Sequence, residues 1–123
     1  MAKVVAVIGA SSNRNKFGNR AVRAFRQQGY TVVPINPNEV EVEGLKAYRS
    51  VLDVPGAIDM ASIYVPPEIG EQVIGEIAQK GIAEVWLNPG AESDELIKRA
   101  KALNIHPIVA CSIVAIGENP YRL

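Results

Sequence analysis

The sequence predicts an α/β domain built on one mainly parallel, doubly wound sheet with helices on both faces. Short apolar runs alternate with segments of helical periodicity along all 123 residues, and no repeat or linker interrupts them. The run from Val4 to Ile8 is apolar at every position, which is typical of a parallel strand buried on both faces. Because the length suits one domain, we expect residues 1–123 to fold as a single unit.

Six apolar runs are expected to be strands, and the third of them is the weakest. Right-handed crossovers carry the first half of the chain to one edge of the sheet and the second half to the other, giving strand order 3-2-1-4-5-6. The order reverses between the first and fourth strands, and ligands bind in the crevice that opens at their carboxyl ends. The expected strands are residues 3–8, 31–35, 45–48, 60–65, 84–87 and 107–110.

Helices are expected between the strands, each with one apolar face. Pro67 stands in the first turn of the second helix, where proline is tolerated. Asp94 and Glu95 open the third helix, where the helix dipole favours negative charge. The helices are expected at residues 19–28, 67–80 and 93–103, with a short turn capped by Ser50 at residues 50–52.

Charge and composition argue against several classes of partner. Thirteen Lys and Arg residues balance thirteen Asp and Glu residues, so no overall field favours nucleic acid or an anionic membrane. The single Cys111 excludes an internal disulfide and supplies too few soft ligands for a zinc or iron–sulfur site. No apolar run approaches the roughly 20 residues of a membrane span, and no signal-peptide segment precedes the first strand. We therefore expect a cytoplasmic protein.

The first loop of the expected crevice has the composition of an anion site. Gly9 ends the first strand and lets backbone amides turn toward a bound anion before the next helix begins. The loop also carries two hydroxyls, Ser11 and Ser12, and two cations, Arg14 and Lys16. Such a loop suits a bulky phosphate cluster. The other loops expected at the crevice are residues 36–38, 65–68 and 88–90.

Two common nucleotide motifs do not fit the sequence. The dinucleotide fingerprint G-x-G-x-x-G has Ser11 in place of its second glycine, and the next glycine after Gly9 is Gly18. The second strand ends in an Asn-Pro-Asn sequence where an NAD site has an acidic residue, and Glu39 is a poor substitute. No glycine is followed by Lys and Ser or Thr at P-loop spacing, which argues against ATP hydrolysis of that type.

Four motifs in these loops together point to a known family. They are Val-Ile-Gly-Ala-Ser at 7–11 followed by Lys-Phe-Gly at 16–18, Val-Pro-Ile-Asn-Pro-Asn at 33–38, Ile-Tyr-Val-Pro-Pro at 63–67, and Val-Trp-Leu-Asn-Pro-Gly at 85–90. With them, nearly the whole chain resembles the small CoA-binding proteins. The Rossmann-like domain of those proteins also forms the amino-terminal part of the succinyl-CoA synthetase α subunit and of related nucleoside-diphosphate-forming acyl-CoA synthetases.

The resemblance implies a Rossmann-like fold with CoA or acyl-CoA as ligand. It implies that Ser11, Ser12 and Lys16 lie along the CoA phosphates. It also implies that the adenosine lies between Asn36 and Pro37, and that the third and fourth loops line the pantetheine. The implied binding residues are Gly9, Ala10, Ser11, Ser12, Lys16, Phe17, Gly18, Asn36, Pro37, Val65, Pro66, Pro67, Asn88, Pro89 and Gly90.

The crevice loops carry no catalytic constellation. The only histidine, His106, begins the last strand and is expected at the opposite end of the sheet. The loops hold no pair of carboxylates, no Ser–His pair and no metal-ligand cluster. The sequence therefore favours non-catalytic binding of CoA or acyl-CoA. Two alternatives stay open: an NAD(P)-binding, oxidoreductase-like protein, and a subunit of an acyl-CoA synthetase that depends on a partner chain.

The last part of the chain is too apolar to lie free in solvent. Residues 111–116 include Ile113, Val114 and Ile116, and either close the core or meet another copy of the chain. A homodimer is therefore a further hypothesis.

Overall fold

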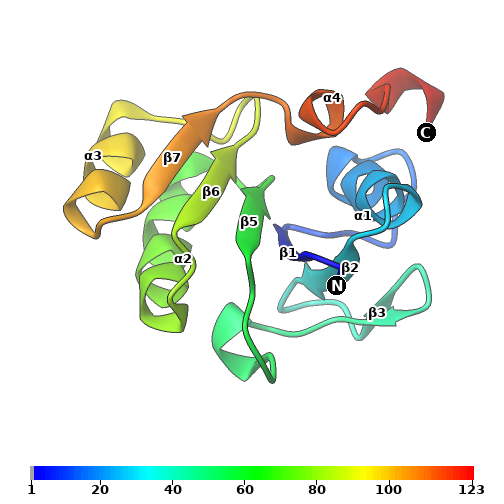
Figure 1. Cartoon of the computed structure of the whole chain (residues 1–123), viewed down its shortest axis with the longest axis horizontal. Coiled ribbons are helices and arrows are strands. Elements are labelled where there is room, and N and C mark those ends of the chain that lie inside the picture. The colour runs from blue at the N-terminus through cyan, green and yellow to red at the C-terminus, as the bar shows by residue number, and fades with distance from the viewer. Residues whose placement is uncertain (1) are drawn as a thin grey trace.

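A five-stranded parallel sheet forms the centre of the molecule in the computed structural model, which describes residues 2–123 (Figure 1). Its strands are β1 Val4–Ile8, β2 Thr31–Ile35, β5 Met60–Ile63, β6 Glu84–Leu87 and β7 His106–Val109. They lie in the order β2-β1-β5-β6-β7, and each neighbouring pair is parallel. The order reverses between β1 and β5, which confirms the predicted Rossmann-like α/β fold class.

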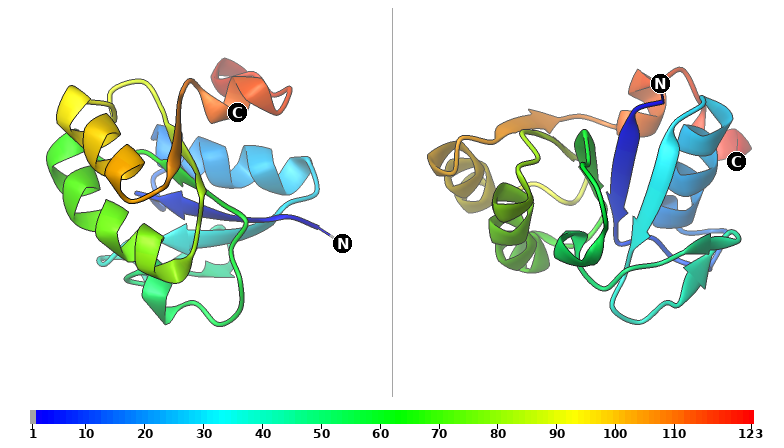
Figure 2. Two further views of the ribbon diagram at one scale, coloured as in Figure 1. Left: turned by 60° about the vertical axis from the view of Figure 1, so that its left-hand side comes forward. Right: turned by 60° about the horizontal axis from the view of Figure 1, so that its bottom comes forward.

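Helices cover both faces of this sheet (Figure 2). The helices α1, Phe17–Gln27, and α4, Ser112–Ala115, lie on one face, whereas α2, Pro67–Lys80, and α3, Asp94–Ala102, lie on the other. Successive side chains of β1 point to opposite faces, so Val5 and Val7 pack with α1, and Ala6 and Ile8 pack with α2 and α3. The three predicted helices are confirmed, with ends that differ by no more than two residues.

The predicted third strand, residues 45–48, is wrong as a member of the main sheet. The chain instead forms a small antiparallel hairpin from β3, Glu41–Val42, and β4, Leu45–Lys46. Glu43 and Gly44 turn the hairpin, with φ angles of 51° and 77°, and two consecutive positive φ angles favour a two-residue hairpin turn.

Only one bridge joins this segment to the sheet, a parallel bridge between Ile35 and Tyr48. The backbone N–H of Tyr48 donates to the Pro34 carbonyl at 3.0 Å, and the Asn36 N–H donates to the Tyr48 carbonyl at 2.9 Å. A proline on this edge of β2 has no N–H with which to extend the ladder. The predicted order therefore holds for five strands, and its sixth strand is reduced to this bridge.

Short 3-10 turns complete the chain. The turn η1, Val51–Asp53, is capped as predicted, because the Ser50 hydroxyl accepts from the Leu52 N–H at 3.1 Å. The tail continues from α4 to η2, Pro120–Arg122. Ile113 is fully buried beside α1, so this part of the tail closes the core.

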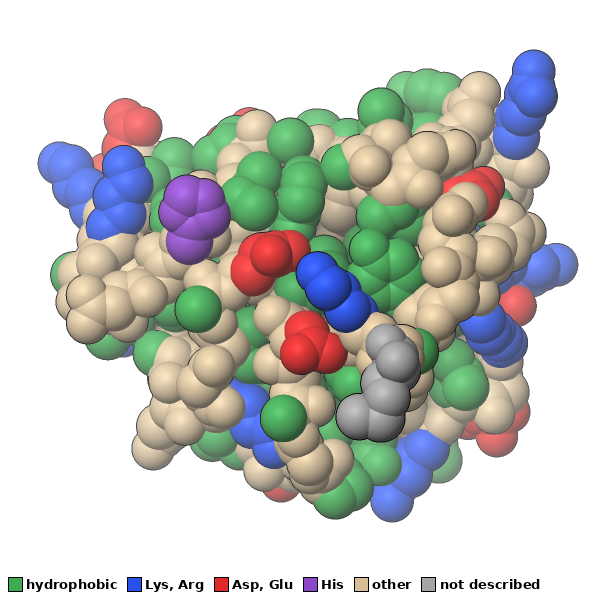
Figure 3. All heavy atoms as spheres, viewed as in Figure 1, with side chains coloured by type: hydrophobic (Ala, Val, Ile, Leu, Met, Phe, Trp, Pro, Cys, Tyr) green, Lys and Arg blue, Asp and Glu red, His purple; other side chains and the backbone are tan. Residues whose placement is uncertain are grey.

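The same tail also leaves apolar surface in solvent. The side chain of Val114 is 59% exposed and that of Val109, at the end of β7, is 52% exposed. Figure 3 shows hydrophobic side chains gathered along the upper part of the molecule, over β7 and toward α4. The homodimer stays a hypothesis. None of the helices described within residues 2–123 combines the length and the apolar character needed to cross a membrane.

Candidate functional site

A cavity of about 700 Å³ opens at the carboxyl ends of β1, β5 and β6, where the strand order reverses. Its position is the one expected for ligand sites in doubly wound sheets, and its size lies within the range of small-molecule pockets. The residues that line it are Gly9, Ser11, Lys16, Phe17, Gly18, Asn36, Tyr64, Val65, Pro66, Asn88, Pro89, Gly90, Ala91, Cys111, Val114, Pro120 and Tyr121.

The first wall of the cavity is the glycine loop, which we define as residues 9–18. The loop leaves the sheet and returns to the same point, and its two glycines make this return possible. Gly9 has a φ of 88°, in the region that favours glycine. A Cβ placed on Gly18 would lie 2.2 Å from the Gly9 carbonyl oxygen. Both positions therefore require glycine for structural reasons, whatever they bind.

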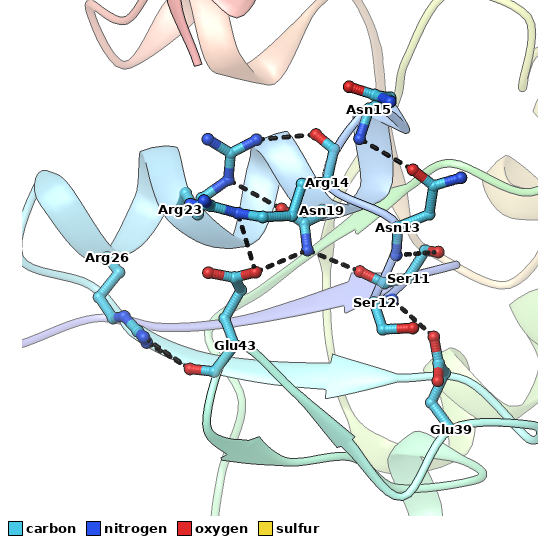
Figure 4. A network of polar contacts seen from close by, with 10 residues as sticks. All are labelled: Ser11, Ser12, Asn13, Arg14, Asn15, Asn19, Arg23, Arg26, Glu39 and Glu43. Atoms are coloured by element: carbon cyan, nitrogen blue, oxygen red, sulfur yellow. Dashed lines mark hydrogen bonds and ion pairs between the residues drawn. The ribbon is translucent and has the colours of Figure 1, made fainter.

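Polar side chains shape the interior of the glycine loop. The Ser11 hydroxyl accepts from the Asn13 N–H, and the Asn13 side chain accepts from the Asn15 N–H, both at 3.0 Å. From α1, the Asn19 side-chain amide donates to the Ser11 carbonyl at 2.8 Å (Figure 4). The bonds accepted by Ser11 and Asn13 each span two residues and form local turns of the kind that Ser and Asn favour. The Ser11 hydroxyl is thus already an acceptor within the loop, although Ser11 also lines the cavity.

The N-terminus of α1 faces this loop and is open to an anion. Lys16 stands at the cap position, this helix end has no side-chain cap, and its first turn contains no acidic residue. Free amides and the helix dipole make such an end favourable for phosphate. Lys16 also lines the cavity. The second predicted cation, Arg14, points away, because its Nε forms an ion pair with Glu43 Oε2 at 3.3 Å.

The second loop is tied to the glycine loop by one asparagine. The Asn36 side-chain amide donates to the Ala10 carbonyl at 2.7 Å, and its oxygen accepts from the Asn38 N–H at 2.8 Å. Asn36 lines the cavity, and the neighbouring Pro37 lies exposed outside it. Asn36 therefore fixes the spacing of two walls of the cavity.

The third loop joins β5 to α2. Val65 and Pro66 line the cavity, and Pro67 is the first residue of α2, where a missing N–H costs nothing. The Val65 side chain lies 3.0 Å from the position that a Cβ on Gly9 would take. The third loop therefore packs directly on the glycine loop.

A buried polar network forms the far wall of the cavity. The Asn88 side chain is 1% exposed and makes four hydrogen bonds, donating to the Ser62 hydroxyl and the Ile63 carbonyl, and accepting from the backbone N–H and the hydroxyl of Ser112. The distances between the bonded atoms are 2.9 to 3.0 Å. The side chain of Asn88 is fully occupied by the protein itself. Its function is to hold the β6–α3 loop and the tail together.

Tyr64 joins the same network at the cavity wall. Its hydroxyl lies 3.0 Å from the Ser112 hydroxyl, which is itself 2.7 Å from the Ser62 hydroxyl. Burial raises the pKa of Tyr64 above its ordinary value of 10.0, and the hydrogen bond with Ser112 opposes this shift only in part. Tyr64 is therefore a neutral hydrogen-bonding residue of the wall.

Eleven of the fifteen predicted binding residues line the cavity. The other four do not: the Ala10 side chain is buried in the core beside α1, Ser12 and Pro37 lie exposed outside the cavity, and Pro67 belongs to α2. Their predicted ligand contacts, and those of the eleven, stay predictions.

Sequence reasoning missed the contribution of the tail. Cys111 and Val114 line the cavity, as do Pro120 and Tyr121. Cys111 follows the last strand, so the topology alone could have placed it near the crevice. Nothing in the sequence indicates that η2 returns over α1. The return is held by a hydrogen bond from Arg20 Nη1 to the Pro120 carbonyl at 3.1 Å and by the edge-to-face rings of Phe17 and Tyr121.

Few of the side chains that line the cavity are ionisable. Lys16 is the one charged side chain among the lining residues, and none of them is a histidine or a carboxylic acid. His106 lies exposed at the start of β7, at the opposite end of the sheet from the cavity. Within residues 2–123, no group of three or more His, Cys, Asp or Glu side chains could hold a metal ion.

Comparison with known proteins identifies ADP-forming acetate–CoA ligases among the relatives of this chain. The chain is 42% identical over 82 residues to the acetate–CoA ligase (ADP-forming) II subunit alpha of Pyrococcus furiosus, covering 66% of this chain and 18% of that protein. It is 42% identical over 101 residues to the acetate–CoA ligase (ADP-forming) II of Archaeoglobus fulgidus, covering 80% of this chain and 15% of that protein. The chain thus spans about a fifth or less of the length of these ligases.

Solved structures and a family model extend the comparison. A conserved hypothetical protein from Pyrococcus furiosus is 35% identical and superposes with a TM-score of 0.84, over 94% of this chain and 99% of that one. The dinucleotide-forming acetyl-coenzyme A synthetase 1 of Ca. Korarchaeum cryptofilum is 30% identical, with a TM-score of 0.75 over 85% of this chain and 25% of that one. The model of the CoA binding domain matches residues 3–117, and the chain belongs to this family.

Proposed function

We propose that this protein binds CoA or an acyl-CoA in the cavity at the carboxyl ends of β1, β5 and β6, and does not itself catalyse a reaction. The observation that carries the proposal is the open N-terminus of α1 beside Lys16, at the point where the strand order reverses. An uncapped helix end with a lysine at its cap position suits a pyrophosphate. Membership of the CoA binding domain family and the size of the cavity support CoA as the pyrophosphate-bearing ligand.

The proposed orientation follows from the chemistry of the walls. The pyrophosphate lies on the glycine loop and the N-terminus of α1, and the adenosine lies toward Asn36. The pantetheine then runs along the less polar walls formed by Val65, Pro66 and residues 88–90. Asn88 contributes backbone to this wall, because its side chain is consumed by the buried network.

Parallel calorimetric titrations with CoA, dephospho-CoA, NADH and ATP test the proposal. We expect saturable binding of CoA that is tighter than binding of NADH or ATP. In Lys16→Ala, loss of the cavity cation should weaken CoA binding about tenfold, since a charge-assisted hydrogen bond contributes on the order of 1.5 kcal/mol. Lys101→Ala removes an exposed lysine of α3 outside the lining and is the matched control. Tighter binding of NADH than of CoA would favour the oxidoreductase-like alternative instead.

A second candidate function is that of a subunit of an acyl-CoA synthetase. It is favoured by the ADP-forming acetate–CoA ligases among the relatives, and by the lack of histidine and carboxylate in the cavity lining, which leaves the chemistry to a partner chain. The purified chain, supplied with CoA, ATP and acetate, should then form no ADP. ADP formation that depends on the chain alone would contradict both candidates.

A further inference from the structure

One carboxylate outside the cavity lining occupies a donor of the glycine loop. The Glu39 Oε2 accepts from the backbone N–H of Ser12 at 2.5 Å (Figure 4). Ser12 follows Ser11, and Glu39 lies three residues after Asn36, so the contact sits at the rim between two residues that line the cavity. The hydrogen bonds from Ser12 hold the pKa of Glu39 below its ordinary value, and the carboxylate is ionised at neutral pH.

Glu43 provides a second carboxylate to the same region, and it is held differently. Its Oε2 accepts from the Asn19 side chain at 3.1 Å and pairs with Arg14. Its carbonyl accepts from both terminal nitrogens of Arg26 at 2.7 Å, and its backbone forms the tight turn of the β3–β4 hairpin. Glu43 is therefore anchored to α1 from several sides.

Glu39, in contrast, lies in the connection between β2 and β3. Its backbone is held on both sides, since its N–H donates to the Asn36 carbonyl at 3.4 Å and the neighbouring Val40 carbonyl accepts from the Ala47 N–H at 2.9 Å. Its carboxylate is bonded to Ser12, whereas that of Glu43 is bonded to both Asn19 and Arg14. The Glu39 carboxylate therefore breaks fewer contacts when it moves.

A carboxylate oxygen and a phosphate oxygen accept the same hydrogen bond from a backbone amide, and they repel each other. Only one of them can hold the Ser12 N–H. The proposed orientation of the nucleotide brings its ribose toward Asn36, so a phosphate on that ribose would approach this rim. Such a phosphate must displace Glu39, and it must then remain close to the negative charge of that residue.

We propose that Glu39 is a specificity-determining residue that occupies the Ser12 amide as an internal anion and makes the site discriminate against a phosphate on the nucleotide ribose. The inference rests on the proposed function, because the orientation of CoA defines which phosphate reaches the rim. Dephospho-CoA, which keeps the pantetheine and the pyrophosphate of CoA and lacks the ribose phosphate, is the probe for this discrimination.

Titrations of wild type and Glu39→Gln with CoA, dephospho-CoA and pantetheine test the assignment. Removal of the charge should tighten CoA binding about twofold to fivefold, the range expected for a charge pair in solvent, and less so at high salt. Dephospho-CoA should change less than twofold and pantetheine not at all. Glu41→Gln removes an equal charge from an exposed neighbour in β3 that does not touch the loop, and should leave all three affinities unchanged.

A probe without adenosine separates this inference from the proposed function. Inorganic phosphate, as a stand-in for the ribose phosphate, should perturb the amide resonance of Ser12 at a lower concentration in Glu39→Gln than in wild type. Failure of CoA to bind any variant would overturn the proposed function, whereas a lower phosphate requirement would still support competition at Ser12. Equal or weaker CoA binding by a folded Glu39→Gln, or an unchanged phosphate response, would overturn the role of Glu39.

Discussion

The two walls of the cavity are built in opposite ways. The glycine loop is held by solvent-accessible hydrogen bonds, such as those that the Asn13 and Glu39 side chains accept, and by the close approach of Gly9 and Gly18. The far wall is held by Asn88 and Ser112, which are each 1% exposed and which join segments 24 residues apart. The glycine loop presents hydrogen-bond donors that a ligand can bind, whereas the side-chain donors of Asn88 and Ser112 in the far wall are already bonded within the protein.

This difference assigns separate tasks to similar residues. An exposed hydrogen bond exchanges readily with water, so its loss costs little, whereas a buried donor left without a partner retains its full desolvation cost. The glycine loop can therefore adjust to an anion, and the far wall provides a fixed surface against which the rest of the ligand lies. Asparagine is used on both walls, and its environment decides whether it contributes to recognition or to stability.

The largest effect is expected from Asn88→Ala. It removes four hydrogen bonds and leaves the Ser112 N–H and the Ile63 carbonyl buried without this partner. The free energy of unfolding should fall by about 3 kcal/mol. Urea denaturation measures the change, with Asn13→Ala in the glycine loop as the matched substitution.

Because the Asn13 side chain makes one exposed hydrogen bond, Asn13→Ala should cost about 0.5 kcal/mol. Equal losses in the two variants would show that the walls do not differ in the way their contacts imply.

A smaller loss of stability but a larger loss of binding is expected from Gly18→Ala. The added Cβ meets the Gly9 carbonyl oxygen at 2.2 Å, and backbone must move to relieve the clash. The free energy of unfolding should fall by about 2 kcal/mol, within the range for overpacking, and CoA binding should weaken more than tenfold because the loop amides are displaced.

Gly75→Ala is the control for this change. Gly75 lies inside α2, and the nearest atom to an added Cβ is the end of the Arg99 side chain at 3.7 Å. Alanine should leave binding unchanged and stabilise the helix by up to about 1 kcal/mol. Undiminished CoA binding by Gly18→Ala would mean that the geometry of the glycine loop does not control recognition.

The sequence reveals the glycine loop more fully than it reveals the far wall. Gly9 and Lys16 can be placed because a buried strand, a glycine and a helix start follow one another locally, and local signals survive without knowledge of the fold. The partners of Asn88 come from β5 and from the tail, and no spacing in the sequence connects Ser62 with Ser112. That wall depends on which strands become neighbours.

The misplaced strand at residues 45–48 has a related origin. Its apolar character is real, since Leu45 and Tyr48 pack on the core. The Glu43-Gly44 turn favours a hairpin, and Pro34 limits its pairing with the sheet to one bridge. Both features are visible in the sequence. A hydrophobic pattern shows that a segment is partly buried, and the available N–H donors of its neighbour decide whether it can join a ladder.

The smallest of the three main effects is expected from the tyrosine that joins the far wall to the cavity. Because the pKa of Tyr64 is raised in the folded protein, the unfolded chain loses this proton first as the pH rises above about 10. The proton remains bound in the folded state, so stability is present below that pH and falls above it, by up to about 1.4 kcal/mol per pH unit until Tyr64 itself ionises.

Tyr64→Phe should cost about 1 kcal/mol at neutral pH, through loss of the 3.0 Å contact with Ser112, and should flatten this alkaline decline. Urea denaturation from pH 8 to 11 compares the two proteins. If Tyr64→Phe declines with pH as steeply as wild type, the hydroxyl of Tyr64 titrates freely and the far wall is open to solvent.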